Sequence, residues 1–204
     1  MSGTSLDGFD LICASFEKKD VWEFEIIKAT TYSYSDHWKN ALANLHKQNP
    51  IKIQNTENKY VNLMGKNILD FTKGLQDIDF VCSPGHTVFH KPDQGITLQI
   101  GNTANLSTFI NHPVICDFRT QDVALGGQGA PLVPVGDLHL FGSYSACLNL
   151  GGFANVSKKG KNIVTAYDIC AVNTVLNKLA GEKGLEYDFQ GSLAKSGKNI
   201  QKLF

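Results

Sequence analysis

The stretch from Asp117 to Pro134, DFRTQDVALGGQGAPLVP, concentrates the residue types that most readily do chemistry. It places an arginine and two carboxylates beside glycine backbone that a ligand could approach closely. Asp122 is the candidate general base, because Arg119 nearby could set the pKa and geometry of its carboxylate. A structural ion pair of Arg119 with Asp117 or Asp122 accounts for the same residues, so both interpretations stand.

The glycines and the amide of this stretch suit a neutral polar ligand. Gly126 and Gly127 permit a ligand to come close to the backbone. Gln128 supplies a neutral donor and acceptor for sugar hydroxyls or for an amide. The stretch therefore combines a candidate base with a candidate sugar site.

Histidines follow another short apolar run, Ile78 to Cys82, at a position where ligand contacts fit. His86 and Thr87 are candidate contacts, while for His90 a hydrogen bond to the loop around Pro92 is the preferred interpretation. No histidine or cysteine pair has the spacing of metal ligands, so no zinc site is predicted.

Glycine-bearing turns at two places in the chain could bind phosphate. In the first, Gly3 to Gly8, backbone amides and hydroxyls could converge on anionic oxygens, and Asp7 could hold a hydrated divalent cation. A capped β-turn would use the same residue types. The second, Gly151 to Asn155, is ordinary hairpin sequence. The presence of the first turn supports a phosphate-binding role for it, since two facing turns could clamp a polyphosphate.

Strands and helices are predicted on both sides of the Asp117 to Pro134 stretch, which is itself expected to stay irregular. The segments before it predict a hairpin of Phe9–Phe16 with Val21–Thr31, followed by helices at Ser35–Lys47 and Thr56–Lys73. Strands are predicted at Ile78–Cys82 and Ile96–Ile100, then a helix at Asn102–Phe109 and a strand at Val114–Asp117. Those after it predict strands and then a helix, at Ala146–Leu150, Phe153–Ser157, Ile163–Tyr167 and Asp168–Leu179. The repeated strand, glycine turn, strand order predicts an internal duplication of an α/β fold.

Composition excludes several classes of protein. The 204 residues are 42% hydrophobic and 19% charged, which is typical of globular domains. With 19 basic and 19 acidic residues, no net charge draws the chain to nucleic acid or to a membrane. The absence of a leader and of a long apolar run predicts a cytoplasmic protein, and the five scattered cysteines are expected to be buried reduced thiols.

Four segments together resemble one enzyme family. They are SGTSLDGFD, TLQIGN, DFRTQDVALGGQGAPLVP and NLGGFANVS, and the chain closely resembles the anhydro-N-acetylmuramic acid kinases over essentially its whole length. The resemblance implies the actin-like, sugar kinase and Hsp70 ATPase fold, which is ribonuclease H-like, with two α/β halves around a cleft for Mg-ATP. Residues 1–137 would form the first half and residues 138–204 the start of the second.

The same resemblance implies a reaction and a set of site residues. ATP and water would convert the anhydro sugar into N-acetylmuramic acid 6-phosphate, a step in cell-wall sugar recycling, with Asp122 activating the water. Sugar contacts would come from His86, Thr87, Arg119, Gly127 and Gln128. ATP contacts would come from the two turns, with Mg²⁺ at Asp7, and comprise Gly3, Thr4, Ser5, Leu6, Asp7, Gly8, Phe9, Asp10, Gly151, Gly152 and Asn155.

The chain departs from the family pattern in places, which keeps alternatives open. It reads SPGHT where the family commonly reads SHGQT, and DICAVN at Asp168 to Asn173 where a DTGPGN-like segment is expected. Family members are longer and begin with a strand, so a truncated relative acting as a sugar-binding module is one alternative. A second alternative is another sugar or acetate kinase of the same fold, and a third is a structural role. The assembly could be a homodimer.

Overall fold

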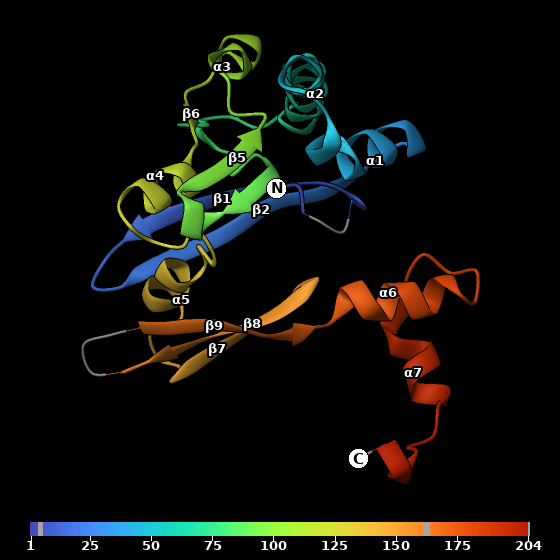
Figure 1. Ribbon diagram of the computed structural model, residues 1–204. Coiled ribbons are helices and arrows are strands. Elements are labelled where there is room, and N and C mark those ends of the chain that lie inside the picture. The colour runs from blue at the N-terminus through green and yellow to red at the C-terminus, as the bar shows by residue number, and fades with distance from the viewer. Residues whose placement is uncertain (4–5, 161–163, 204) are drawn as a thin grey trace. The chain divides into compact units, whose positions relative to one another are not determined.

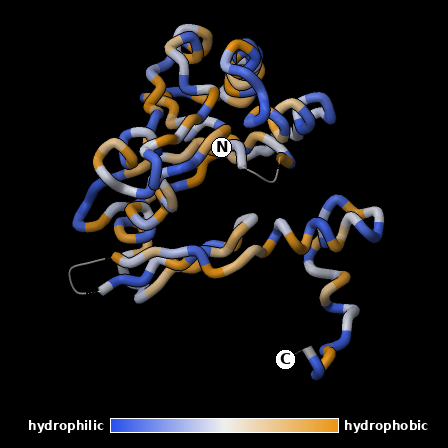
Figure 2. The backbone as a smooth tube through the Cα atoms, viewed as in Figure 1, coloured by the Kyte–Doolittle hydropathy of each residue, from blue (hydrophilic) through white to orange (hydrophobic). Residues whose placement is uncertain are grey.

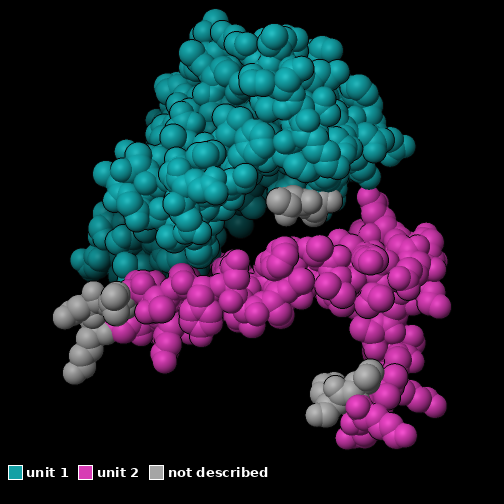
Figure 3. Space-filling view, viewed as in Figure 1, with its two compact units in different colours: residues 1–140 teal, residues 141–204 magenta. Residues whose placement is uncertain are grey.

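The computed structural model describes residues 1–3, 6–160 and 164–203 and has a mixed α/β architecture (Figure 1). The chain divides into two units, Met1–Leu140 and Phe141–Phe204, which are coloured separately in Figure 3. The division expected after Asp137 lies slightly earlier in the chain than this boundary. Each unit is described on its own.

A long antiparallel hairpin opens unit 1. Strands β1 (Gly8–Lys18) and β2 (Trp22–Ser33) pair along their whole length, with an irregularity between Cys13 and Ala14. This confirms the predicted hairpin. Ser2 forms an isolated antiparallel bridge with Phe9, so the segment before the first glycine turn folds back onto the start of β1.

Two helices follow, and the cap residues explain where each begins. Helix α1 (Asp36–Ala43) starts after Ser35, whose hydroxyl accepts from the Trp38 amide, and a short 3-10 helix, η1 (Leu45–Lys47), continues it. Helix α2 (Pro50–Phe71) begins earlier than the expected Thr56. The expectation was wrong because Asn49 caps the helix and Pro50 occupies the first turn, where its missing amide costs nothing.

Small two-stranded sheets carry the next part of unit 1. Strands β3 (Val81–Cys82) and β6 (Val114–Ile115) pair in parallel, and β4 (His86–Lys91) pairs antiparallel with β5 (Ile96–Ile100) around a 3-10 turn, η2 (Pro92–Gln94). Helix α3 (Ala104–Ile110) leads to β6. The β5 and α3 predictions are confirmed, β3 and β6 are shorter than expected, and β4 was not predicted because SPGHTVFHKP reads as a loop.

The expected irregular stretch after β6 is wrong in part, since it contains two short helices. Helix α4 (Phe118–Ala124) starts directly after Asp117, whose φ of 61° turns the chain out of β6. The Asp117 carbonyl accepts from the Gln121 amide, which closes the first helical turn. Helix α5 (Pro134–Leu140) begins at the proline that was expected to end the loop. The candidate residues Arg119 and Asp122 therefore lie on a helix.

Unit 2 contains a three-stranded antiparallel sheet and short helices. The strands are β7 (Ala146–Leu150), β8 (Phe153–Lys159) and β9 (Val164–Ala171), in that order across the sheet. The expected helix from Asp168 is wrong at its start, because β9 continues pairing with β8 to Ala171. Ile163, where the third strand was expected to begin, lies outside the described residues. The remaining elements are α6 (Asn173–Gly181), η3 (Phe189–Gly191), α7 (Ser192–Ser196) and η4 (Gln201–Leu203).

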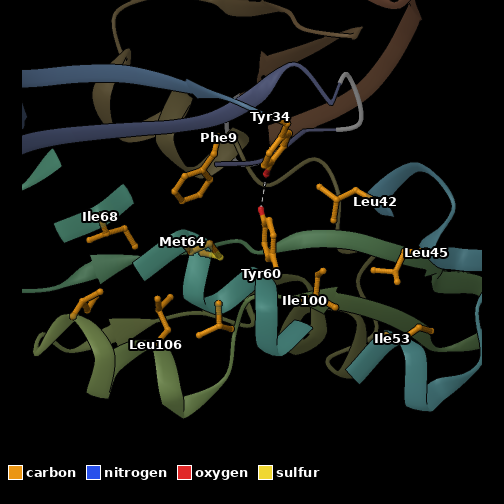
Figure 4. Close-up of a cluster of buried hydrophobic side chains, with 12 residues drawn as sticks. Phe9, Tyr34, Leu42, Leu45, Ile53, Tyr60, Met64, Ile68, Ile100 and Leu106 are labelled. Carbon is orange, nitrogen blue, oxygen red and sulfur yellow. Dashed lines mark hydrogen bonds between the residues drawn. The ribbon is translucent and has the colours of Figure 1, made fainter. Parts of the chain in front are cut away.

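The core of unit 1 packs against one face of α2. Polar and apolar residues alternate along this helix (Figure 2). Side chains from β1, α2, β5 and α3 meet there, as Figure 4 shows. Each fully buried side chain of this kind contributes roughly 1.5–3 kcal/mol by removal from water. The cluster comprises Phe9, Tyr34, Leu42, Leu45, Ile53, Tyr60, Val61, Met64, Ile68, Ile100, Leu106 and Ile110.

The cysteines are free thiols, but the expectation that they are buried is wrong. Cys82 and Cys170 are exposed, and the other three are partly buried. Both exposed thiols lie on strands, β3 and β9, that have only one neighbouring strand. Among the described helices, none is long and apolar enough to cross a membrane.

Candidate functional site

The candidate base and its arginine hold the same glycine from opposite sides. The Gly129 amide donates to Asp122 Oδ2 at 2.6 Å, and Arg119 Nη1 donates to the Gly129 carbonyl at 2.6 Å. Within the described residues, no ion pair joins Arg119 to Asp117 or Asp122, so that alternative is wrong. Burial lowers the pKa of the Arg119 guanidinium, as expected for a cation that no carboxylate neutralises.

Glycine at position 127 is required by the carboxylate beside it. The Gly127 amide donates to the Asp122 carbonyl at 2.8 Å, and a Cβ at Gly127 would lie only 2.2 Å from Asp122 Oδ2. Asp122 is half-buried, and its Oδ1 accepts no hydrogen bond within the described part of the chain. This leaves one carboxylate oxygen able to accept a proton from a bound water. Gln128 lies exposed in the same loop.

Polar residues that the sequence did not single out meet beside Asp117. Asn102 Nδ2 donates to Asp117 Oδ1 at 3.2 Å, and the Ser83 hydroxyl donates to Asn102 Oδ1 at 3.4 Å. Glu57 Oε1 accepts from the Gly101 amide at 3.3 Å. Burial raises the pKa of the Glu57 carboxyl, and the charge of Asp117 raises it further. The TLQIGN segment was a signal for Asn102, whereas nothing in the helical sequence around Glu57 indicated its place here.

His86 and Thr87 begin β4, and the two side chains differ in accessibility. His86 is 4% exposed, and its Nδ1 is 2.9 Å from the Ser2 hydroxyl oxygen. Burial lowers the pKa of the His86 imidazole to about 4, so the ring is neutral near pH 7. Thr87 is partly buried, and His90 Nδ1 lies 3.2 Å from Thr97 Oγ1 across the hairpin. His90 therefore has its partner on β5 and not in the loop around Pro92.

The first glycine turn is closed by backbone pairing at its base. The Asp10 amide donates to the Met1 carbonyl at 2.8 Å, and the Leu6 amide donates to the Gly3 carbonyl at 3.3 Å. Asp7 is exposed, and its Oδ1 accepts from the Gly8 amide at 2.9 Å. Thr4 and Ser5, the hydroxyl residues expected to bind phosphate, lie outside the described residues.

Side chains at the end of this turn point in different directions. Phe9 is 4% exposed and belongs to the unit 1 core. Asp10 is exposed on β1, and its Oδ1 accepts from the Thr31 hydroxyl at 2.6 Å. The Asp7 and Asp10 carboxylates thus lie at the surface, while the Phe9 side chain anchors the turn.

The second glycine turn is held by the start of α6. The Gly152 carbonyl accepts from the Val172 amide at 2.8 Å and from the Thr174 hydroxyl at 3.0 Å, and the Gly151 carbonyl accepts from the Asn173 amide at 3.2 Å. Asn155 Oδ1 is buried and finds no hydrogen-bond partner within the described residues. The turn is therefore fixed by backbone, and one candidate ligand group in it is unsatisfied.

A metal ion would have the exposed Asp7 carboxylate as a ligand at the first turn. The described residues contain no group of three or more His, Cys, Asp or Glu side chains that could hold a metal. One exposed carboxylate, Asp7, fits Mg²⁺, which commonly binds through one or two carboxylates together with waters and substrate phosphates. The residues present are thus compatible with Mg²⁺ delivered together with a nucleotide.

The predicted site residues of unit 1 fall into two groups. Arg119, Asp122 and Gly127 come together around Gly129. The first turn meets His86 through the hydroxyl of Ser2. The candidate residues Gly151, Gly152 and Asn155 belong to unit 2.

Comparison with known proteins relates the chain to one family. A family model described as "Anhydro-N-acetylmuramic acid kinase" matches residues 1–204. Proteins of that name from Methylobacterium nodulans, Pseudomonas putida and Bacillus cereus are 34%, 36% and 33% identical to this chain. These matches cover 97% of the chain and 60%, 56% and 57% of the three relatives, so the chain spans less than two thirds of their length.

Proposed function

The chain belongs to the anhydro-N-acetylmuramic acid kinase family, and on that premise we propose that it serves the reaction that this name describes. The substrates would be ATP, water and anhydro-N-acetylmuramic acid, and the products ADP and N-acetylmuramic acid 6-phosphate. The reaction would take place in the cytoplasm, where ATP is available. The observation that carries the proposal is the family's central motif folded around a half-buried Asp122 with one unbonded carboxylate oxygen.

The proposed fold is the actin-like, sugar kinase and Hsp70 ATPase arrangement, which is ribonuclease H-like. Unit 1 would correspond to the first α/β half, expected at residues 1–137, and unit 2 to the start of the second, expected at residues 138–204. The mixed α/β content, and a glycine turn that leads into an antiparallel pair of strands in each unit, support this assignment.

Asp122 is the proposed general base. Its Oδ2 is held by the Gly129 amide, so Oδ1 can take a proton from a water as that water attacks the anomeric carbon. The anomeric carbon's bond to the bridging O6 then breaks, and O6 takes the γ-phosphoryl group while ADP leaves. Because Arg119 and Gly127 fix the loop on either side of this carboxylate, the base needs no rearrangement to act.

The remaining loop residues are the proposed sugar contacts. Gln128 is exposed and offers an amide donor and acceptor, and Gly127 permits a sugar to approach the backbone beside Asp122. Thr87 and Arg119, both partly buried, would add a hydroxyl and a guanidinium at the edge of this site. His86 belongs to the same group by sequence, but its buried ring would support the site from inside.

The phosphates of ATP are proposed to bind the two glycine turns. The first turn would contribute Gly3 to Asp10, with Asp7 holding Mg²⁺, and the second Gly151, Gly152 and Asn155. Mg²⁺, when bound, neutralises charge on the phosphates and orients the transferred group. The exposed Asp7 carboxylate supports the first of these assignments.

The proposal is tested by following ADP release from Mg-ATP with and without the anhydro sugar. Asp122→Asn keeps an oxygen for the Gly129 amide but loses the base, so turnover should fall by about 100-fold or more while the sugar still binds. Asp93→Asn, which changes an exposed carboxylate in η2, is the matched control and should leave turnover unchanged.

The outcomes separate the readings of this chain. Near-normal turnover in Asp122→Asn would remove Asp122 as the base. Sugar binding by the wild-type chain with no ADP release would instead favour a sugar-binding module. Release of ADP with a different sugar or with acetate, and not with the anhydro sugar, would point to another kinase of the same fold.

A further inference from the structure

A buried chain of side-chain hydrogen bonds joins four segments of unit 1 that are separate in the sequence. The Tyr60 and Tyr34 hydroxyl oxygens are 2.7 Å apart, Tyr34 donates to the Ser2 hydroxyl at 2.7 Å, and Ser2 Oγ is 2.9 Å from His86 Nδ1. Exposures of 0%, 5%, 9% and 4%, in the order Tyr60, Tyr34, Ser2, His86, show that water reaches none of these groups freely. Figure 4 shows the first of these bonds at the centre of the unit 1 core.

The direction of donation along this chain follows from the bond between Tyr34 and Ser2. Tyr34 donates to Ser2, so Tyr34 accepts from Tyr60, and the Ser2 hydroxyl is left to donate to His86. Each hydroxyl then gives one hydrogen bond and accepts one. With Ser2 donating, the last acceptor is a neutral imidazole with an unprotonated Nδ1. A lowered pKa caused by burial is consistent with that state of His86.

Ser2 brings this chain of bonds to the first glycine turn. Its side chain points into the core, while its backbone bridges to Phe9 at the base of the turn. The adjacent Met1 carbonyl accepts from the Asp10 amide at 2.8 Å. The turn proposed to bind phosphate is therefore fixed to the core through the residue immediately before Gly3.

Strand β4 connects this anchor with the loop of Asp122. His86 lies at the start of β4, and His90 lies near its end. A Cβ added to Gly129 would meet His90 Cε1 at 3.3 Å, so the β4 hairpin packs against the glycine that Asp122 and Arg119 hold. One strand thus contacts the anchor of the phosphate turn and the loop of the proposed base.

We propose that His86 is a positioning residue, which fixes the first glycine turn on β4 through Ser2 and so sets it relative to the Asp122 loop. The inference rests on the proposed function where it assigns ATP phosphates to this turn. Its geometric part, the fixing of the turn, stands independently. A small displacement of either group would cost rate, because phosphoryl transfer depends on alignment of the reacting atoms.

Hydrogen exchange of the backbone amides in residues 1–10 tests the geometric part. Tyr34→Phe removes the hydroxyl between Tyr60 and Ser2, and we expect exchange in this segment, including the Asp10 amide, to become about tenfold faster. Tyr32→Phe is the matched control, since the Tyr32 hydroxyl donates to Asp70 Oδ2 at 2.9 Å on the surface. It should leave exchange at residues 1–10 unchanged, and amides of β7 to β9 should stay protected in both variants.

Substitution of His86 separates positioning from simple space filling. His86→Asn places an amide oxygen close to the position of Nδ1, so it should keep the slow exchange of residues 1–10. His86→Leu fills the site without an acceptor and should behave like Tyr34→Phe. In the same variants, Mg-ATP affinity should fall about tenfold in His86→Leu and recover in His86→Asn.

The outcomes test the link from His86 to the first turn separately from the assignment of this turn to ATP. Fast exchange in Tyr34→Phe and His86→Leu, with rescue by His86→Asn, supports the link whether or not ATP binds. If these variants exchange like the wild type, or if His86→Asn is as fast as His86→Leu, the positioning role is overturned. If the wild type fails to bind Mg-ATP while the exchange pattern holds, the assignment of this turn to ATP fails and the link remains.

Discussion

The two glycine turns are held in different ways. The first is fixed from inside unit 1, through Ser2 and the buried side chains of Tyr34 and His86. The second is fixed by backbone carbonyls that accept hydrogen bonds from the start of α6. The first turn should be sensitive to side-chain changes far away in the sequence, and the second should depend on its neighbouring helix.

Acid should weaken the first anchor and spare the second, which is the largest effect expected. The ordinary pKa of histidine is 6.5, and burial lowers that of His86 to about 4. Between these pH values the His86 imidazole is protonated in the unfolded chain and neutral in the folded chain. The free energy of unfolding therefore falls as the pH drops from 6.5 to 4. The full loss is roughly 3 kcal/mol in the free energy of unfolding.

Amide exchange of residues 1–10 and 146–160 measured between pH 7 and 4, after correction for intrinsic rates, checks this difference. All six histidines lie in residues 1–140, so the second turn has no equivalent group. His86→Asn should remove the extra acid sensitivity of the first turn. Equal loss of protection at both turns in the wild type would contradict the proposed anchor.

A methyl group at Gly8 should destabilise the first turn more than one at Gly152 destabilises the second. A Cβ at Gly8 would lie 2.8 Å from the Tyr32 carbonyl oxygen, and backbone cannot move aside easily. A Cβ at Gly152 would meet only the Thr174 hydroxyl, at 3.1 Å. We expect Gly8→Ala to cost about 2 kcal/mol of unfolding free energy and Gly152→Ala less than about 0.5 kcal/mol, measured by urea denaturation. Similar costs at the two sites would show that both turns are equally confined.

Removal of one hydroxyl at the start of α6 should give the smallest effect. Thr174→Val keeps the side-chain shape but deletes the bond from Oγ1 to the Gly152 carbonyl, which is 3.0 Å long. The expected loss is about 0.5 kcal/mol, because the group is exposed and water can replace it. Thr165→Val, an exposed threonine in β9, serves as the control. A loss no greater than that of the control would mean that the backbone bonds alone hold this turn.

Local patterns in the sequence were enough to predict much of the fold. Alternation of apolar residues predicted the β1–β2 hairpin, and Ser35 marked the start of α1, because these signals depend only on neighbouring residues. The same reasoning was wrong at Phe118, where the glycines that follow suggested a loop and α4 forms first. It was also wrong for residues 168–171, where pairing with β8 outweighs a helical pattern.

The site itself was predictable only in part. The residue types in DFRTQDVALGGQGAPLVP indicated a base and a ligand loop, but not that Arg119 and Asp122 would both hold Gly129. The contact of Ser2 with His86 spans 84 positions, and that of Glu57 with Gly101 spans 44. Such contacts depend on how distant segments pack, and no local periodicity contains that information.

Titration calorimetry with anhydro-N-acetylmuramic acid tests most directly whether the Asp122 loop is a sugar site. The wild-type chain should bind the sugar with a saturable heat, and Gly127→Ala should weaken binding at least about tenfold, by pushing the Asp122 carboxylate away. Gly136→Ala, where a Cβ would meet nothing within 4 Å, should bind like the wild type. Absence of binding by the wild-type chain, or unchanged affinity in Gly127→Ala, would contradict the account.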